Sequence, residues 1–219
     1  MKKIIKTLTF LAIILSATFI SNAQGTFKGT IKYKISAEGR ELSAQEKAQM
    51  PSEQIIYFRN PYSKADNISA MGGTSSISNS ETGEIIILID MMGQKIAFKG
   101  EKNDTTEEKE IDPVVKDLEE SKTILGYKCK KYEIIIEGGT KMEAYITEDI
   151  DAEDPLLSNF KNIKGFMLEY SSTNEADEDL ILNYVATEVK KGKIKKSVFK
   201  IPTGYEVKTL EDLKNMMGG

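Results

Sequence analysis

The residues with most capacity for chemistry are acidic, and their densest run is Glu148, Asp149, Asp151, Glu153 and Asp154. Carboxylate oxygens at such spacing are the ligands that Ca²⁺ prefers. An EF-hand loop starting at Asp149, however, needs glycine where Asp154 stands and a bidentate acid where Phe160 stands. These mismatches favour a solvated acidic loop over a calcium site. We expect no metal and no other cofactor.

Few enzymatic mechanisms are open to this composition. The chain contains no histidine, which excludes Ser-His-Asp and Cys-His catalysis and histidine-rich zinc sites. No phosphate-binding loop of the Gly-x-x-x-x-Gly-Lys-Ser/Thr or Gly-x-Gly-x-x-Gly pattern occurs. Two carboxylates would suffice for a glycosidase, but no pair stands out among the 34 Asp and Glu residues. We therefore expect no enzyme, and a carboxylate-based hydrolase ranks last among the alternatives.

Cys129 is the only cysteine, so an intrachain disulfide cannot form. Lys128, Lys130 and Lys131 flank it, and nearby cations lower the pKa of a thiol, as a redox site requires. In a strand, however, residue 129 points away from its two neighbours. The pattern favours a small packed hydrophobic residue.

A basic run from Lys190 to Lys196 contains five lysines and no acid. It predicts a hairpin tip that could contact anionic lipid headgroups or a negatively charged partner. Such lysines more often keep an edge strand soluble, and that interpretation is favoured here. The whole chain has a net charge of −4, which argues against nucleic acid as a partner.

Residues 1–23 have the layout of a secretory signal peptide. Three lysines precede an apolar stretch, Leu8–Ile20, and small residues follow as far as Ala23. A membrane-spanning helix needs about 20 apolar residues, so we expect cleavage near Ala23 and no integral span afterwards. Residue 24 is glutamine, not the lipidated cysteine of a bacterial lipoprotein. Residues 24–219 are then one β-rich domain, periplasmic or secreted.

Alternation of apolar and polar residues dominates this domain. Phe27–Ile35 alternates strictly, as a half-buried strand does, and further strands follow as far as Val198–Ile201. Ile85–Ile89 and Leu180–Val189 are apolar on both faces, as strands covered on both sides are. No segment has the β-α-β pattern, so we expect an α+β, β-rich fold with one antiparallel sheet of ten or eleven strands.

Three or four short helices are expected to cover the sheet. Ser43 and Glu46 form a capping box for one of them. Asp112–Ser121 and Asp154–Phe160 each begin with an N-cap followed by proline. Thr209 caps a terminal helix with an apolar stripe of Leu210, Leu213, Met216 and Met217.

The segment Lys122–Glu137 follows the predicted helix Asp112–Ser121. Its pattern predicts a strand at the centre of the sheet. Gly126 near its start predicts a bulge or a close approach of backbones.

The excess of apolar residues on both faces of several strands has two interpretations. One is an ordinary core filled by the covering helices and a second layer. The other is a cavity for an acyl chain or a hydrophobic segment, to which flexible methionine side chains adapt well. The candidate cavity residues are Met91, Met142, Met167, Leu182, Tyr184 and Met216.

Several stretches together resemble known secreted proteins. They are Gly29–Tyr33, Ile124–Lys131, Glu143–Thr147, Lys164–Leu168 and Ile201–Tyr205. The pattern is similar to the uncharacterised DUF4412-type and GLPGLI-like proteins, whose layout is similar to the LolA-like lipoprotein-carrier fold. The resemblance implies a curved, unclosed half-barrel, lidded by short helices around an apolar cavity. It brings no catalytic residue with it.

The leading hypothesis is an exported, soluble binding protein for a lipid, an acyl chain or a lipoprotein in the cell envelope. It depends on the export signal, the absence of histidine, the strands that are apolar on both faces, and the resemblance to secreted proteins with a LolA-like layout. The alternative is a structural or interaction module of the envelope with a filled core and no small-molecule ligand.

Overall fold

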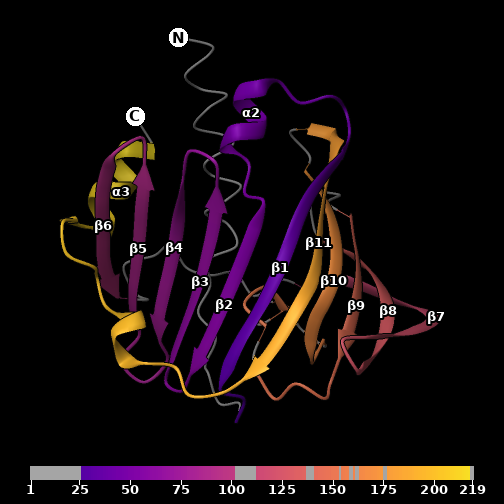
Figure 1. Ribbon diagram of the computed structural model, residues 1–219. Coiled ribbons are helices and arrows are strands. Elements are labelled where there is room, and N and C mark those ends of the chain that lie inside the picture. The colour runs from indigo at the N-terminus through magenta and orange to yellow at the C-terminus, as the bar shows by residue number, and fades with distance from the viewer. Residues whose placement is uncertain are drawn as a thin grey trace.

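A computed structural model describes residues 26–101, 112–136, 141–152, 154–157, 160, 163–174 and 177–217. These residues form one open, curved sheet of twelve strands in the order β12-β6-β5-β4-β3-β2-β1-β11-β10-β9-β8-β7 (Figure 1). The strands are β1 (Gly29–Gly39), β2 (Glu53–Arg59), β3 (Tyr62–Ser69), β4 (Gly72–Asn79), β5 (Glu84–Met91), β6 (Gln94–Glu101), β7 (Val114–Ile124), β8 (Tyr127–Ile135), β9 (Lys141–Thr147), β10 (Phe166–Asn174), β11 (Asp177–Lys191) and β12 (Glu206–Thr209).

The predicted antiparallel sheet is confirmed with one exception. Ten of the neighbouring pairs are antiparallel, and β12 alone runs parallel to its neighbour β6. The predicted strand Leu180–Val189 belongs to β11, which pairs with β1 in the middle of the sheet. The two halves of the chain therefore meet at the β1–β11 pair. Strand β11 is not covered on both faces as predicted, because Val185 is 38 % exposed.

The prediction of three or four covering helices is wrong for the described residues. They contain two α-helices, α2 (Ala44–Gln49) and α3 (Leu210–Met217), and one 3₁₀ turn, η3 (Lys196–Phe199). The capping box of α2 is confirmed, because Ser43 and Glu46 bond each other's backbone N–H groups. The Thr209 cap of α3 is also confirmed, since its hydroxyl accepts from the Asp212 N–H at 3.1 Å.

The predicted helix Asp112–Ser121 is instead part of edge strand β7, which pairs with β8. A helix of about ten residues gains little from its own hydrogen bonds, so pairing with a neighbouring strand outweighs the local N-cap and proline signals. An irregularity in the pairing between Asp117 and Ser121, with Glu119 at a φ of 57°, interrupts this edge. Strand β8 is consequently next to the edge of the sheet, not at its centre as predicted.

Three further predicted elements differ. The predicted last strand, Val198–Ile201, overlaps η3 (Lys196–Phe199) at its first two residues and is not a strand. In the predicted helix Asp154–Phe160, the described residues 154–157 form a turn. Gly126 forms, with Leu125, the tight turn between β7 and β8, in which both residues have positive φ (87° and 49°). Nothing lies within 4 Å of a Cβ placed on Gly126, so backbone conformation and not close approach accounts for this glycine.

Two apolar clusters lie on one face of the sheet, which we call the inner face. The register places Ile31, Ile56, Ala65, Ser76, Ile87 and Phe98 in one continuous row across it. Ile31 and Ile56 belong to a large cluster in which Ile150, Leu157 and Phe160 cover strands β1, β2 and β8–β11. Ile87 and Phe98 belong to a smaller cluster, which is covered by Leu210 and Leu213 of α3.

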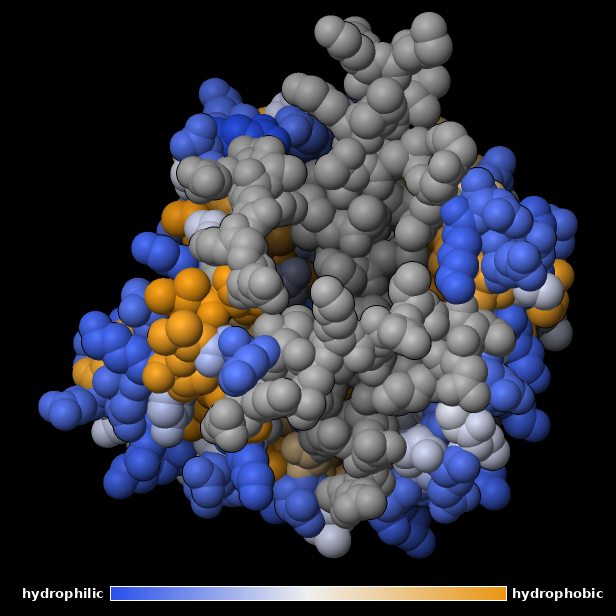
Figure 2. Space-filling model, turned by 180° about the vertical axis from the view of Figure 1, so that it is seen from behind, coloured by the Kyte–Doolittle hydropathy of each residue, from blue (hydrophilic) through white to orange (hydrophobic). Residues whose placement is uncertain are grey.

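Among the described residues, the opposite, outer face is covered over β2–β6. There Phe199 of η3 packs with Ile77, Ile86, Leu88 and Ala97. Over β7–β11 the outer face carries exposed or half-exposed polar side chains such as Lys122 of β7 and Glu169 of β10, which form an ion pair 2.6 Å apart. Figure 2 shows the inner side of the molecule, where apolar surface is bordered by hydrophilic side chains.

Some predictions fall outside the described residues. They include the signal peptide at 1–23, Glu153 of the acidic run, and residues 158 and 159 of the helix predicted at Asp154–Phe160. Within the described ranges, no helix is long and apolar enough to cross a membrane.

Candidate functional site

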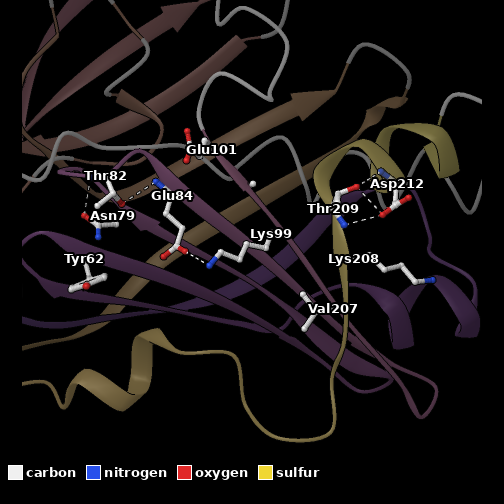
Figure 3. Close-up of a pocket in the computed structure, with 11 residues that line it drawn as sticks. Tyr62, Asn79, Thr82, Glu84, Lys99, Glu101, Val207, Lys208, Thr209 and Asp212 are labelled. Atoms are coloured by element: carbon white, nitrogen blue, oxygen red, sulfur yellow. Dashed lines mark hydrogen bonds and ion pairs between the residues drawn. The ribbon is translucent and has the colours of Figure 1, made fainter.

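An open cleft lies at one edge of the sheet, where β12 ends. Thr209, the last residue of β12, pairs with Lys99. Strand β6 ends at Glu101 and therefore extends two residues beyond the end of β12. The cleft has a volume of about 910 Å³, which lies within the roughly 300–1,000 Å³ typical of small-molecule sites. Its lining comes from five strands, the β4–β5 turn and α3 (Figure 3): Tyr62, Asn79, Thr82, Glu84, Lys99, Gly100, Glu101, Val207, Lys208, Thr209 and Asp212.

Two polar pairs hold the walls of the cleft. Lys99 Nζ lies 2.6 Å from Glu84 Oε1 across the β5–β6 pair. Asp212 Oδ2 accepts hydrogen bonds from the Thr209 backbone N–H at 2.8 Å and from its hydroxyl at 2.7 Å. These bonds, the backbone one first, lower the pKa of Asp212. Both pairs are drawn in Figure 3.

Apolar surface is available in the same cleft. Val207 is 57 % exposed, and Tyr62 stacks on Phe199 with ring centroids 5.5 Å apart. The Glu84–Lys99 pair is a partly exposed ion pair (32 % and 53 %), and such pairs contribute only about 0–1 kcal/mol to folding. The cleft therefore offers charges of both signs beside an apolar contact, which suits a ligand with a polar and an apolar part.

A strip of small and polar side chains separates the two apolar clusters of the inner face. It comprises Ser63, Ala65, Asn67, Thr74, Ser76 and Ser78, which alternate along β3 and β4. Ser63 and Ser78 are hydrogen-bonded at 2.7 Å, and Gln54 Nε2 donates to Asn67 Oδ1 at 2.9 Å. These bonds satisfy polar groups that are buried.

A buried polar group lies beside this strip, at the inner face of β1 and β10. The Tyr33 hydroxyl donates to the Met167 carbonyl at 2.5 Å. The Asp154 carboxylate accepts from the backbone N–H groups of Leu156 (2.9 Å), Leu157 (3.3 Å) and Met167 (3.0 Å). Asp154 thus connects the segment covering the large cluster to strand β10.

Burial dominates the acid–base properties of this group. It raises the pKa of Asp154 to about 6, although the three backbone hydrogen bonds act in the opposite direction. It also raises the pKa of Tyr33 and of Tyr170 well above the ordinary value, and that of Tyr184 to about 12. A cavity of only about 20 Å³ adjoins Tyr33, Asp154 and Tyr170, enough for about one water molecule.

The six predicted cavity residues do not come together. Met142 and Met167 are buried in the large cluster, and Tyr184 packs against it, stacked on Tyr170 at 4.4 Å. Leu182 lies half-buried on β11 and Met91 half-buried at the end of β5, while Met216 on α3 is 53 % exposed. Neither the cleft nor the small cavity is lined by any of the six. Their role in ligand binding stays a prediction.

Cys129 is fully buried in the large cluster, which confirms its interpretation as a packed residue. Burial raises the pKa of its thiol, which is the opposite of what a reactive thiolate requires.

The acidic run is not uniformly solvated, contrary to the prediction, because Asp154 is 4 % exposed. Asp151 is exposed and accepts hydrogen bonds from the Thr26 N–H and hydroxyl. Over the described part of the chain, no three Asp, Glu or Cys side chains converge as metal ligands do.

The cleft residues escape sequence-based prediction because they lie far apart in the sequence. Glu84 and Lys99 meet only through the β5–β6 register, and Thr209 reaches them through a parallel strand that no pattern predicts. The polar strip, by contrast, could have been predicted from the alternation of residues in the sequence. Ser63-x-Ala65-x-Asn67 and Thr74-x-Ser76-x-Ser78 place small residues on one face of two consecutive strands.

Comparison with known proteins gives similarity of fold only. No protein-family model matches the chain, so the resemblance to DUF4412-type and GLPGLI-like proteins stays a prediction. No curated protein matches it either. The chain is similar to the solved structure of PNGF-II, with a TM-score of 0.52 and 16 % identity over 88 % of this chain. It spans 33 % of the length of PNGF-II, and at this identity the similarity concerns the fold alone.

Two other solved structures are more distant in shape. An uncharacterized conserved protein from Thermus thermophilus has a TM-score of 0.48 and 10 % identity, covering 83 % of this chain and 91 % of its own. A LolA superfamily protein from Nitrosomonas europaea has a TM-score of 0.35 and 10 % identity, covering 88 % and 96 %. These TM-scores are too low to carry an argument about fold or function.

Proposed function

We propose that the protein is an exported, non-catalytic binding protein whose ligand is a lipid, an acyl chain or a segment of a lipoprotein. The observation that carries the proposal is the open cleft of about 910 Å³ at the β6–β12 edge. Its size suits the polar end and the first part of a chain-like amphipathic molecule. The sequence resemblance to secreted proteins with a LolA-like layout, itself a prediction, favours the same class of ligand.

The lining of the cleft supports binding in two parts. Val207 and Tyr62 give an apolar contact for a hydrocarbon segment, which gains about 25 cal/mol for each Å² of apolar surface removed from water. Lys99 and Lys208 supply ammonium groups for a phosphate or carboxylate head. The partly exposed partner of Lys99, Glu84, can be exchanged for such a head at little cost.

The same residues support a non-catalytic role. Hydrolysis by two carboxylates needs one acid as general acid and a second as base or nucleophile. Three acids line the cleft. Glu84 pairs with Lys99 and lies opposite Glu101 in the β5–β6 register. Asp212 accepts from the Thr209 backbone N–H, and its pKa is lowered rather than raised. A general acid needs a raised pKa.

A pair of valine variants tests the binding site. Val207 and Val114 lie on the two edge strands at opposite ends of the sheet and are 57 % and 67 % exposed. Val207→Asp should abolish the thermal stabilisation that a lysophospholipid or a fatty acid gives to the exported chain. Val114→Asp should leave it unchanged, and both variants should keep the unliganded stability within about 0.5 kcal/mol. Equal loss in both variants, or no stabilisation of the parent protein, would reject the cleft as the site.

An interaction module of the envelope without a small-molecule ligand is the second candidate. The observation that favours it lies in the described part of the inner face, where the cavity beside Tyr33 and Asp154 is only about 20 Å³. This candidate predicts that the exported chain carries no small molecule and that neither probe shifts its unfolding temperature.

A further inference from the structure

Seven exposed lysines gather at one end of the sheet, which we call the lysine end. They are Lys28, Lys190, Lys191, Lys193, Lys195, Lys196 and Lys200. No ion pair between described residues joins any of them to a carboxylate. The chain has 30 basic and 34 acidic residues, so the remainder holds 23 basic residues against 34 acidic ones. The lysine end is therefore a positive region on an otherwise strongly negative protein.

The fold brings these lysines together from two parts of the chain. Gly29 at the start of β1 pairs with Lys191 at the end of β11. The Gly192 N–H donates to the Lys28 carbonyl at 2.9 Å, so Lys28 and the lysines of β11 lie side by side. The chain then runs along the lower rim of the sheet to η3, as Figure 1 shows. The predicted hairpin tip is thus a crossing segment, fixed at both ends.

The crossing segment presents charge outward and apolar groups inward. Ile194, Val198, Phe199 and Ile201 pack in the outer-face cluster, and the Arg59 guanidinium donates to the Ile194 carbonyl. The lysines that alternate with these residues are all exposed. The surface is consequently held in place by its own apolar side chains, which are not available to a partner.

We infer that the lysine end docks the protein on a membrane surface that carries anionic phospholipid headgroups. Protein interfaces depend on buried aromatic and apolar anchors, and in the crossing segment these groups pack inward. Lysines alone, without an apolar contact, suit the diffuse negative potential of a lipid surface. The negative remainder of the protein is repelled by the same surface, so this end faces the membrane. The inference is independent of the proposed ligand.

Vesicle co-sedimentation tests it with two triple variants of equal charge change. K193Q/K195Q/K196Q removes three charges from the lysine end, and K128Q/K130Q/K141Q removes three exposed lysines from β8 and β9. Each lysine near an anionic surface contributes about fivefold to partitioning. The first variant should therefore bind vesicles of phosphatidylglycerol and phosphatidylcholine about a hundredfold more weakly than the parent chain. The second should change binding less than threefold or so.

Binding of the parent chain should also be lost in vesicles of phosphatidylcholine alone and at high salt. Equal binding of the two variants, equal binding to neutral vesicles, or no binding of the parent chain would overturn the inference. Release of the parent chain from vesicles by an equal charge concentration of polyglutamate would also overturn it, because the lysine end would then prefer an acidic polypeptide. Circular dichroism of each variant verifies that the sheet is retained.

Discussion

Asp154 gives the sharpest prediction, because burial and hydrogen bonding act on it in opposite directions. It is 4 % exposed, and its pKa is about 6 in the folded protein against 3.8 for an unperturbed aspartate. The folded state therefore binds the proton more tightly than the unfolded state does. Stability from this group is fully present below pH 3.8 and is lost as the pH rises through about 6. The difference between the two pKa values corresponds to about 3 kcal/mol.

The Asp154→Asn variant isolates this contribution, because asparagine has the same shape and does not titrate. Urea unfolding of both proteins at pH 4, 5, 6 and 7 gives the difference in free energy of unfolding at each pH. The pH-dependent contributions of all other carboxylates to the free energy of unfolding cancel in that difference. We expect the stability of the parent protein relative to the variant to fall by about 2 kcal/mol between pH 4 and pH 7, because the unfolded aspartate is already partly ionised at pH 4.

A difference that stays constant or rises with pH would refute the reasoning. It would mean that the backbone N–H groups of Leu156, Leu157 and Met167 favour the carboxylate more than burial disfavours it. Asp151→Asn is the matched control. The exposed Asp151 carboxylate has a pKa lowered by its hydrogen bonds from Thr26. Its contribution is therefore present above the unfolded pKa and lost as the pH falls, the opposite sign.

Three further predictions concern a buried hydrogen bond, the accessibility of the cysteine and a helix cap. Tyr33→Phe removes the hydroxyl that donates to the Met167 carbonyl. The variant should have a free energy of unfolding about 1–3 kcal/mol lower than that of the parent protein. An unchanged midpoint of urea unfolding would show that this hydrogen bond does not stabilise the fold. The Cys129 thiol, fully buried, should react with Ellman's reagent only at the rate of unfolding, and immediate reaction of the native protein would show an accessible thiol. Thr209→Ala removes the N-cap of α3 and should lower the free energy of unfolding in urea by about 0.5–2 kcal/mol. The control, Thr187→Ala on the exposed face of β11, should lower it by less than about 0.5 kcal/mol.

Strands and caps could be predicted because their signals are local. Strict alternation from Phe27 to Ile35 is explained by one buried and one exposed face of β1. The Ser43–Glu46 capping box is likewise contained in four residues. Asp112-Pro113 carries an equally clear local signal and still begins a strand, because pairing with β8 adds more hydrogen bonds than a short helix would.

The site could not be predicted because it depends on register and on one unusual pairing. Glu84 and Lys99 form a diagonal ion pair only after the β5–β6 hairpin sets the register, in which Glu84 lies opposite Glu101 and Lys99 opposite Ile86. The end of β12 defines the cleft, and a four-residue parallel strand leaves almost no periodicity in the sequence. The excess of apolar residues on both strand faces left a cavity and a filled core open as interpretations, and Met142 and Met167 are buried in the core.

Native mass spectrometry of the protein, purified without detergent, tests the central claim most directly. Our account predicts a bound molecule of lipid mass on the parent protein and on Val114→Asp, and its loss from Val207→Asp. A spectrum that contains the unliganded chain alone, both as purified and after incubation with a lysophospholipid, would contradict the account and favour an interaction module.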